Sequence, residues 1–310
     1  MVNKEFHKSL LKWYEKYGRH ELPWRNTDDI YHIYVSEIML QQTQVSRVRD
    51  EYYPKFLKRF PTLEILAQAD LDEVFSLWSG LGYYSRARNL HKTAQMCKNT
   101  LPTEKKELLK LPGIGEYTAS AICSFGYRQN TPVVDTNIAR VIKRLFALLD
   151  ISDKELRKYA TAFINAVDVR AHNLALMDLG SLVCLPKNPK CDECPLRLAC
   201  EGKREPELYT QKKQTFYESL ELFYAVFIQD GQIALKVSDK KLYKGMLVLP
   251  ETEPIEENFI AAFKHSYTKY RLTVNLYEVT AMNEEVVWIS LDELTNAPIS
   301  SLTKKASSFF

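Results

Sequence analysis

The sequence predicts an α+β protein in which a mainly helical part is followed by a smaller strand-rich part. In residues 1–204, apolar side chains recur at three- and four-residue spacing, which is typical of amphipathic helices. After the hydrophilic stretch 202–214 the apolar spacing changes to two, as in half-buried strands. The length of 310 residues also indicates two domains. We therefore expect domains at 1–204 and 219–310, joined by a linker at 205–218.

The predicted helical segments are broken by Pro or Gly at several points along the chain, as amphipathic helices commonly are. In chain order they are FHKSLLKWYEKYG, SEIMLQQTQV, DLDEVFSLWSGLG, RARNLHKTAQMCKN, KELLKL, YTASAICSF and TNIARVIKRLFALL. In the second part, FYAVFI and QIALKV flank Asp230-Gly231 and predict a hairpin. The stretches KYRLTVNLYEV and EVVWIS predict further strands, and a short helix is expected around SSLTKKASSFF.

The charge distribution gives little indication of a partner. Residues 1–205 hold 31 Lys and Arg against 25 Asp and Glu, whereas residues 206–310 hold 11 against 14. A mild basic excess in the first part is compatible with nucleic acid. No apolar run reaches about 18 residues, and the first residues alternate charged with apolar positions. We expect a soluble cytoplasmic protein, nucleoid-associated if it is bacterial, that does not bind membranes.

Four cysteines predict a metal site. Cys184, Cys191, Cys194 and Cys200 are separated by six, two and five residues, and four thiolates this close can surround one centre. A cytosolic chain seldom uses cysteines for disulfides. By their chemistry alone the four thiolates fit either zinc or an iron–sulfur centre. The remaining two, Cys97 and Cys123, lie in helical patterns and read as buried apolar thiols.

Glu37 lies within an apolar helical pattern. At helical spacing its neighbours are Ile33, Tyr34, Leu40 and Gln41, so a helix would press its carboxyl against apolar walls. An acid at the rim of such a face can also reach water, and this stretch alone does not separate the two interpretations. Burial would favour the protonated form.

The stretch LPGIGEYTA predicts a helix-hairpin-helix motif. Gly113 and Gly115 stand between two short helices, where exposed backbone N–H groups can bind a phosphate. An ordinary turn between helices is the alternative. The flanking hydrophobic residues Leu111 and Ile114 favour the motif.

Asp135 stands just before the amphipathic helix TNIARVIKRLF, where an Asp is usually an N-cap. The positive end of a helix dipole also favours the ionised carboxylate, so we expect a lowered pKa for Asp135. Glu37 would then hold its proton and Asp135 would lose it. Two acids of this kind can divide the acid and anion roles in glycosidic bond cleavage.

Several motifs in this order resemble the adenine DNA glycosylases of the MutY type: LPWR, SEIMLQQTQV, GLGYYSRARNLHKTA, LPGIGEYTA, VVDTNIARV, MDLGSLVC and the four-cysteine loop. The resemblance covers nearly all of residues 1–204. It implies two helical lobes around a DNA-binding cleft, a [4Fe–4S] cluster on the four cysteines instead of zinc, and removal of adenine. The implied partner is double-stranded DNA with adenine opposite 8-oxoguanine or guanine, bound by a monomer.

The resemblance also implies roles for single residues. Glu37 matches the catalytic acid, Asp135 the carboxylate that stabilises the sugar cation, and Asn137 the amide beside it. The residues that match the DNA and base contacts are Gln42 and Tyr83 (wedged into the gap left by the base), Trp24 and Arg25 (pocket entrance) and Asp178 (adenine's edge). Aromatic side chains such as Trp24 and Tyr83 are also common in protein cores.

Position 117 bears on the type of reaction. Related glycosylases of the endonuclease III type have a lysine there that forms a Schiff base and cuts the strand. This chain has Tyr117, whose phenol cannot form an imine. The resemblance therefore predicts a monofunctional enzyme that leaves an abasic site.

Residues 219–310 resemble the C-terminal domain of the same family, which is related to Nudix hydrolases and contacts 8-oxoguanine. LYKGMLVLP has Leu247 where a Trp is usual, and ETEPIEENFIAAF lacks the acidic helix that would hold Mg²⁺. We expect this domain to bind and not to hydrolyse. Tyr267-Thr268-Lys269 replaces the lesion-reading Phe-Ser-His, so Thr268 keeps a hydroxyl while Lys269 replaces an imidazole.

Two other functions are compatible with parts of the sequence. A glycosylase of the same fold can act on thymine opposite guanine, but those relatives generally end after the cysteine loop. A non-catalytic iron–sulfur DNA-binding protein would not need both Glu37 and Asp135.

Overall fold

A computed structural model describes the chain in two compact units and covers every residue except 1–3, 211–215, 241, 268, 283–284 and 295–296. Unit 1 contains residues 1–69 and 85–212, and unit 2 contains residues 70–84 and 213–310. The chain thus passes from unit 1 to unit 2 inside the predicted linker. Residues 70–84, which the sequence analysis placed in the helical domain, group with unit 2.

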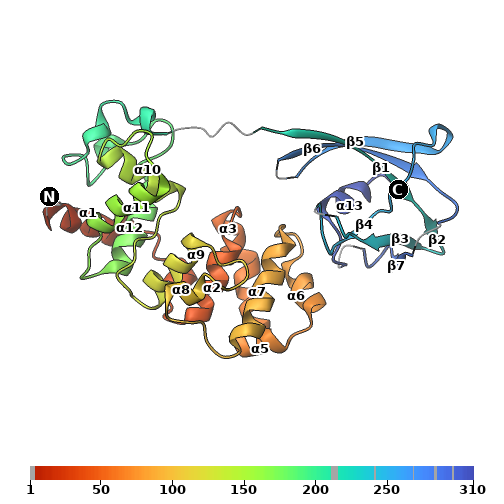
Figure 1. The fold of residues 1–310 in the computed structure, drawn as a ribbon, viewed down its shortest axis with the longest axis horizontal. Helices are drawn as coiled ribbons and strands as arrows, with labels where there is room; N and C mark the ends of the chain where they lie inside the picture. The colour runs from red at the N-terminus through yellow and green to blue at the C-terminus, as the bar shows by residue number, and fades with distance from the viewer. Residues whose placement is uncertain (1–3, 211–215, 241, 268, 283–284, 295–296) are drawn as a thin grey trace. The chain divides into compact units, whose positions relative to one another are not determined.

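Unit 1 is helical, as the apolar spacing predicted (Figure 1). Its helices are α1 (Lys4–Tyr17), η1 (Pro23–Arg25), α2 (Ile30–Met39), α3 (Val45–Arg47), η2 (Val48–Tyr52), α4 (Tyr53–Arg59), α5 (Leu63–Gln68), α7 (Tyr84–Cys97), α8 (Lys105–Leu108), α9 (Glu116–Ala121), η3 (Ile122–Gly126), α10 (Thr136–Leu145), α11 (Asp153–Phe163), α12 (Val169–Leu182), η4 (Cys191–Glu193), η5 (Glu201–Lys203) and η6 (Pro206–Tyr209).

Helix α2 begins at a side-chain cap and ends sooner than predicted. The Asp29 carboxylate accepts hydrogen bonds from the backbone N–H groups of Tyr31 and His32. The expected helix through Val45 stops at Met39, because Gln42 has a left-handed φ of 58° that an α-helix cannot contain. Residues 40–44 therefore form a turn directly after the helical turn that carries Glu37.

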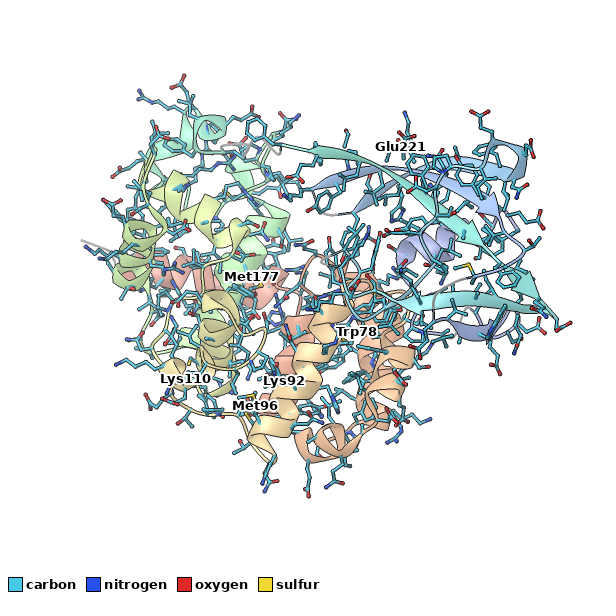
Figure 2. All side chains as sticks on the ribbon, turned by 45° about the vertical axis from the view of Figure 1, so that its right-hand side comes forward. Trp78, Lys92, Met96, Lys110, Met177 and Glu221 are labelled. Carbon is cyan, nitrogen blue, oxygen red and sulfur yellow. The ribbon has the colours of Figure 1, made fainter. Side chains whose placement is uncertain are left out.

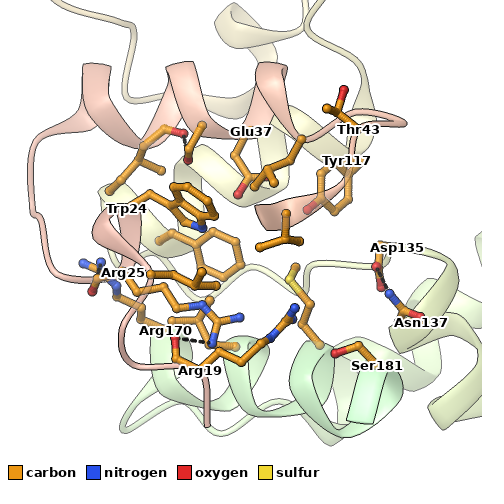
Figure 3. A pocket seen from close by; sticks show the side chains of 18 residues that line it. Arg19, Trp24, Arg25, Glu37, Thr43, Tyr117, Asp135, Asn137, Arg170 and Ser181 are labelled. Carbon is orange, nitrogen blue, oxygen red and sulfur yellow. Dashed lines mark hydrogen bonds between the residues drawn. The ribbon is translucent and has the colours of Figure 1, made fainter. Parts of the chain in front are cut away.

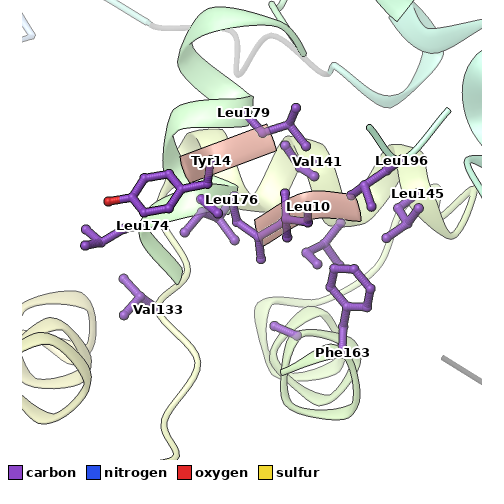
Figure 4. Packing of buried hydrophobic residues seen from close by; sticks show 14 of the residues in the cluster. Leu10, Tyr14, Val133, Val141, Leu145, Phe163, Leu174, Leu176, Leu179 and Leu196 are labelled. Carbon is purple, nitrogen blue, oxygen red and sulfur yellow. The ribbon is translucent and has the colours of Figure 1, made fainter. Parts of the chain in front are cut away.

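A hydrophobic core holds the helices around α10 and α12 together (Figure 4). Leu10 of α1, Leu145 of α10 and Leu179 of α12 are all buried in it. Burying a side chain of this size contributes about 1.5–3 kcal/mol. This packing fixes α12 against α10, the helix that Asp135 caps.

Helix α7 has one buried and one exposed face. Leu90 and Ala94 are fully buried, whereas Lys92 and Met96 lie on the exposed face (Figure 2). The helix also carries a buried cation, Arg86, of which 8% is exposed. Such a side chain needs hydrogen-bond partners inside the protein.

Unit 2 contains helix α6 (Leu71–Trp78), two small sheets and a C-terminal helix, α13 (Ser301–Ala306). Its strands are β1 (Glu218–Val226), β2 (Ile228–Gln229), β3 (Gln232–Val237), β4 (Leu247–Val248), β5 (Phe259–Tyr267), β6 (Tyr270–Glu278) and β7 (Val287–Ser290). The first sheet has the order β1-β6-β5, with β1 parallel and β5 antiparallel to β6. In the second, β3 pairs with β2, β4 and β7.

The predicted hairpin is correct at its turn and wrong in its extent. Asp230 and Gly231 have positive φ values of 50° and 73°, as a tight hairpin turn requires. However, the strand residues that pair with β3 across this turn are Ile228 and Gln229. The preceding strand β1 pairs instead with β6 in the other sheet. Alternation in the sequence shows that a segment is a strand but does not select its partner.

Candidate active site

A cavity of about 260 Å³ in unit 1 brings together side chains from distant parts of the sequence (Figure 3). Helix α2 supplies Glu37, α9 supplies Tyr117, and the N-terminal end of α10 supplies Asp135. The predicted site residues that line the cavity are Trp24, Arg25, Glu37, Tyr117, Asp135 and Asn137. The two acids thus line one cavity.

Glu37 is almost completely enclosed, with 6% of the residue exposed. Burial raises the pKa of its carboxyl from 4.5 to about 7, and the negative charge of Asp135 acts in the same direction. A hydrogen bond to Tyr117 and the charge of Arg25 oppose the shift. The direction agrees with the sequence prediction, so Glu37 can hold a proton near neutral pH.

The predicted lowering of the Asp135 pKa is wrong. The carboxylate caps α10, with Oδ1 accepting a hydrogen bond from the Ile138 N–H at 2.7 Å and Oδ2 accepting one from Asn137 Nδ2 at 3.0 Å. Desolvation nevertheless outweighs these bonds and raises the pKa of Asp135. The sequence showed the cap but not how deeply the cap is buried.

Asn137 is held in one orientation by Arg140. The guanidinium donates hydrogen bonds to Asn137 Oδ1 at 2.8 Å, to the Gly180 carbonyl at 2.6 Å and to the Cys184 carbonyl at 2.7 Å. With its oxygen occupied, the amide presents Nδ2 to Asp135. The pair Asp135 and Asn137 is therefore pre-organised without a ligand.

The structure gives Asp178 a role other than the expected contact with adenine. Its carboxylate is fully buried and does not line the cavity. Its two oxygens accept hydrogen bonds from Arg25 Nη1 and Nη2 at 2.5 and 2.8 Å. They also accept hydrogen bonds from the backbone N–H and the Nε of Arg19 at 2.9 and 2.7 Å. Burial alone would raise the pKa of Asp178, but the two arginines lower it. Asp178 thus holds two cavity-lining cations in place.

Arg19 is one of the site residues that sequence reasoning missed. It lines the cavity together with Arg25, yet it lies 159 positions from Asp178 in the sequence. No local spacing connects these two residues. Only a sequence comparison or the fold itself could have singled out Arg19.

Gln42 and Tyr83 lie in separate units. Gln42 is exposed at the turn after α2, with its left-handed φ of 58°. Tyr83 belongs to unit 2, where its ring stacks on that of Tyr267 with centroids 6.5 Å apart. Thr268, the expected lesion contact, lies outside the described residues.

The hairpin between α8 and α9 needs only one of its two glycines for steric reasons. Gly113 has a φ of +74°, and a Cβ there would lie 2.8 Å from Asn89 Cβ. A Cβ on Gly115 would meet nothing within 4 Å. The backbone at Gly115 is therefore open to an approaching group.

The four predicted metal ligands surround one cavity. Cys184, Cys191, Cys194 and Cys200 line it together with Arg144, Lys190, Arg197 and Lys203. Burial raises the pKa of Cys194 to about 12 and that of Cys200 to about 11. Among the residues that the structure describes, no three potential ligands converge where a single metal ion would fit. The donor set and the surrounding cations fit a centre held by several thiolates.

Arg144 on α10 is hydrogen-bonded to the cysteine loop. This buried guanidinium donates to Cys184 Sγ at 3.2 Å, to the Leu185 carbonyl at 2.7 Å and to the Pro186 carbonyl at 3.0 Å. The cysteine loop therefore packs on the helix that Asp135 caps.

Sequence comparison decides the family. An adenine DNA glycosylase from Buchnera aphidicola subsp. Baizongia pistaciae is 33% identical over an alignment of 327 positions. The alignment covers 94% of this chain and 93% of that protein. The chain belongs to the adenine DNA glycosylase family. Residues 35–166 also match the HhH-GPD superfamily of base excision DNA repair proteins. The human adenine DNA glycosylase is 39% identical over 220 residues, covering 65% of this chain and 40% of that protein.

Solved structures share the fold of this glycosylase family member. A thermostable thymine-DNA glycosylase aligns with a TM-score of 0.60 and 29% identity, covering 64% of this chain and 95% of its own. An endonuclease III–DNA complex aligns with a TM-score of 0.56 and 23% identity, covering 66% and 98%. Both likenesses leave about a third of the chain unmatched, whereas the Buchnera relative spans nearly all of it. Within the described residues no helix is long and apolar enough to cross a membrane.

Proposed function

We propose that this chain removes adenine from double-stranded DNA by hydrolysing its N-glycosidic bond. The observation that carries the proposal is the enclosure of Glu37 and Asp135 in one cavity, with the pKa of Glu37 raised to about 7. The relatives are named adenine DNA glycosylases, which indicates that adenine is the base that is removed. Because side chains inside a cavity cannot reach a base within the stack, the adenine has to be extruded from the helix first.

Glu37 acts as the general acid. Neutral adenine would leave as an anion, so a proton delivered to its N7 makes it a better leaving group. A carboxyl that still carries its proton near pH 7 can deliver it as the bond from the base nitrogen to C1′ breaks. The electron pair of that bond stays with the base, which departs neutral.

Asp135 stabilises the cation that remains on the deoxyribose. Positive charge developing next to a buried carboxylate favours its ionised form, despite the pKa raised by burial. Asn137 and the Ile138 N–H hold the carboxylate in place through the transition state. Water then adds to C1′ and gives one proton to the ionised Glu37 carboxylate, which restores the acid and leaves an abasic site and free adenine.

Tyr117 supports a hydrolytic reaction without strand cleavage. The phenol is hydrogen-bonded to Glu37 and, unlike a lysine amine at this position, cannot form a Schiff base with the sugar. Burial raises the pKa of Tyr117 well above its usual value, so the hydroxyl stays protonated.

Three groups position the DNA in this proposal. Gln42 fills the gap that the extruded base leaves, which its exposed place on the turn supports. The open backbone at Gly115 receives a phosphate. Trp24, 7% exposed at the cavity wall, packs edge to face on Tyr53 and faces the base.

We also propose that the four cysteines hold a [4Fe–4S] cluster. The four thiols line one cavity, and their spacing resembles that of the cluster-binding loop of the adenine glycosylases. Arg144, Arg197 and Lys203 would balance the negative charge of four thiolates. When bound, the cluster would cross-link the loop and support DNA binding, and no chemical step needs it.

The second unit is proposed to read 8-oxoguanine opposite the adenine. Tyr267 is half-buried at the end of β5, and Lys269 Nζ lies 2.5 Å from Glu218 Oε1. Because this ion pair is exposed, it is weak and would release Lys269 to a phosphate at little cost.

Single-turnover kinetics on matched duplexes test the proposal. We expect release of adenine opposite 8-oxoguanine and more slowly opposite guanine, with no release of thymine opposite guanine. The product should be an abasic site that needs alkali to become a nick. Borohydride should trap no covalent adduct, and efficient trapping would mean that a lysine attacks the sugar. Release of thymine in place of adenine would overturn the substrate assignment.

A further inference from the structure

The turn that follows α2 is held by a buried arginine from another helix. Arg86 Nη1, on α7, donates to the carbonyl oxygens of Ile38 at 2.8 Å, Met39 at 3.0 Å and Gln41 at 2.7 Å. Its Nη2 donates to Thr43 Oγ1 at 3.3 Å. One guanidinium thus contacts both sides of residue 42.

These contacts satisfy groups that helix geometry leaves open. The last carbonyls of an α-helix lack partners within the helix, and the negative end of its dipole attracts a cation. Arg86 meets both requirements at the end of α2. Gln41 adds a second tie, since its Nε2 donates to Thr118 Oγ1 on α9 at 3.3 Å.

The turn has two faces with different tasks. Leu40 and Thr43 line the cavity that contains Glu37, whereas Gln42 between them is exposed in a left-handed conformation. A non-glycine residue in that conformation costs about 1 kcal/mol and persists only where its surroundings hold it. Without such a clamp, the cavity wall and the exposed side chain could move independently.

We propose that Arg86 is a positioning residue that locks this turn, so that insertion of Gln42 into the DNA and closure of the base cavity by Leu40 and Thr43 occur as one rigid event. The inference rests on the proposed function. Lysine cannot replace Arg86 here, because an ammonium group is a compact point donor without the planar fork that spans several acceptors.

Two substrates separate this role from a general loss of stability. One duplex has adenine paired with 8-oxoguanine, and the other has adenine opposite a tetrahydrofuran abasic analogue, where extrusion costs little. For Arg86→Lys we expect single-turnover excision to fall about tenfold or more on the paired adenine, the size that corresponds to one lost charge-assisted hydrogen bond. On the unpaired adenine it should fall less than about threefold. The fluorescence rise of 2-aminopurine placed at the target position should diminish in parallel.

Leu90→Ala is the matched control, because it removes a fully buried side chain from the same helix without touching the turn. It should lower thermal stability and affect both substrates equally. Equal losses of Arg86→Lys on the two substrates, or an undiminished 2-aminopurine signal, would overturn the positioning role. If the parent protein excised adenine from neither substrate, the proposed function would fail instead.

Discussion

Replacing Glu37 by Gln should stabilise the folded protein above neutral pH while it abolishes base removal. The pKa of this carboxyl rises from 4.5 to about 7 on burial. Each unit of difference between the folded and unfolded states corresponds to about 1.36 kcal/mol. The shift of about 2.5 units therefore costs the parent protein about 3 kcal/mol once the pH exceeds 7.

The sign follows from proton binding. Between about pH 4.5 and 7 the unfolded chain loses the Glu37 proton while the folded protein retains it, so the free energy of unfolding falls as pH rises. The stabilising contribution is complete below pH 4.5 and is lost by about pH 7. Glutamine has the same shape and does not ionise, so the variant lacks this dependence.

Urea unfolding of parent and variant across pH 4.5 to 8 measures the difference. The gain for Glu37→Gln should be near zero at the acid end and about 3 kcal/mol at the alkaline end. Glu15→Gln is the control, because it makes the same substitution at an exposed carboxyl on α1 that does not line the cavity containing Glu37.

Activity provides the second measurement. Excision by Glu37→Gln should fall by about 10²–10⁴-fold, the usual contribution of a general acid. In the parent protein, kcat/KM should decline above about pH 7 as Glu37 loses its proton. Near-normal excision by the variant, or a stability difference that does not change with pH, would refute the assignment of Glu37 as a buried acid.

Four other substitutions test the surrounding groups. Asp135→Asn should reduce single-turnover excision at least about 100-fold while mismatch binding persists, and near-parent activity would leave Asp135 with only its capping role. Tyr117→Phe removes a hydrogen bond that lowers the Glu37 pKa, so the alkaline limb of kcat/KM should move to higher pH; an unmoved limb would contradict this. Cys194→Ser should lower iron content, melting temperature and DNA affinity more than the rate from bound substrate, and zinc in place of iron in the parent would disprove the cluster. Asp178→Asn should cost about 3–5 kcal/mol in urea unfolding, because the buried guanidinium of Arg25 and the half-buried one of Arg19 lose their counter-charge, and a cost below about 1 kcal/mol would show them to be otherwise compensated.

Local features of the sequence predicted the local structure well. The N-cap at Asp135 and the turn at Asp230-Gly231 each depend on a few consecutive residues, and the structure contains both. The position of α13 likewise followed from a short segment with its own Ser300 cap. Capping and turn geometry involve neighbouring groups only, so residue type and spacing suffice to predict them.

By itself, the sequence determined that a helical part is followed by a strand-rich part, that Asp135 caps a helix, that Asp230-Gly231 forms a turn, and that Glu37 lies on an apolar face. Only the tertiary structure decided that β1 pairs with β6, that Asp178 binds Arg19 and Arg25, and that burial raises the pKa of Asp135. It also decided that α2 ends at Met39, where Arg86 donates hydrogen bonds to the last carbonyls of the helix. The reason is physical: desolvation and charge pairing depend on groups brought together from distant parts of the chain, and spacing along the sequence does not record them.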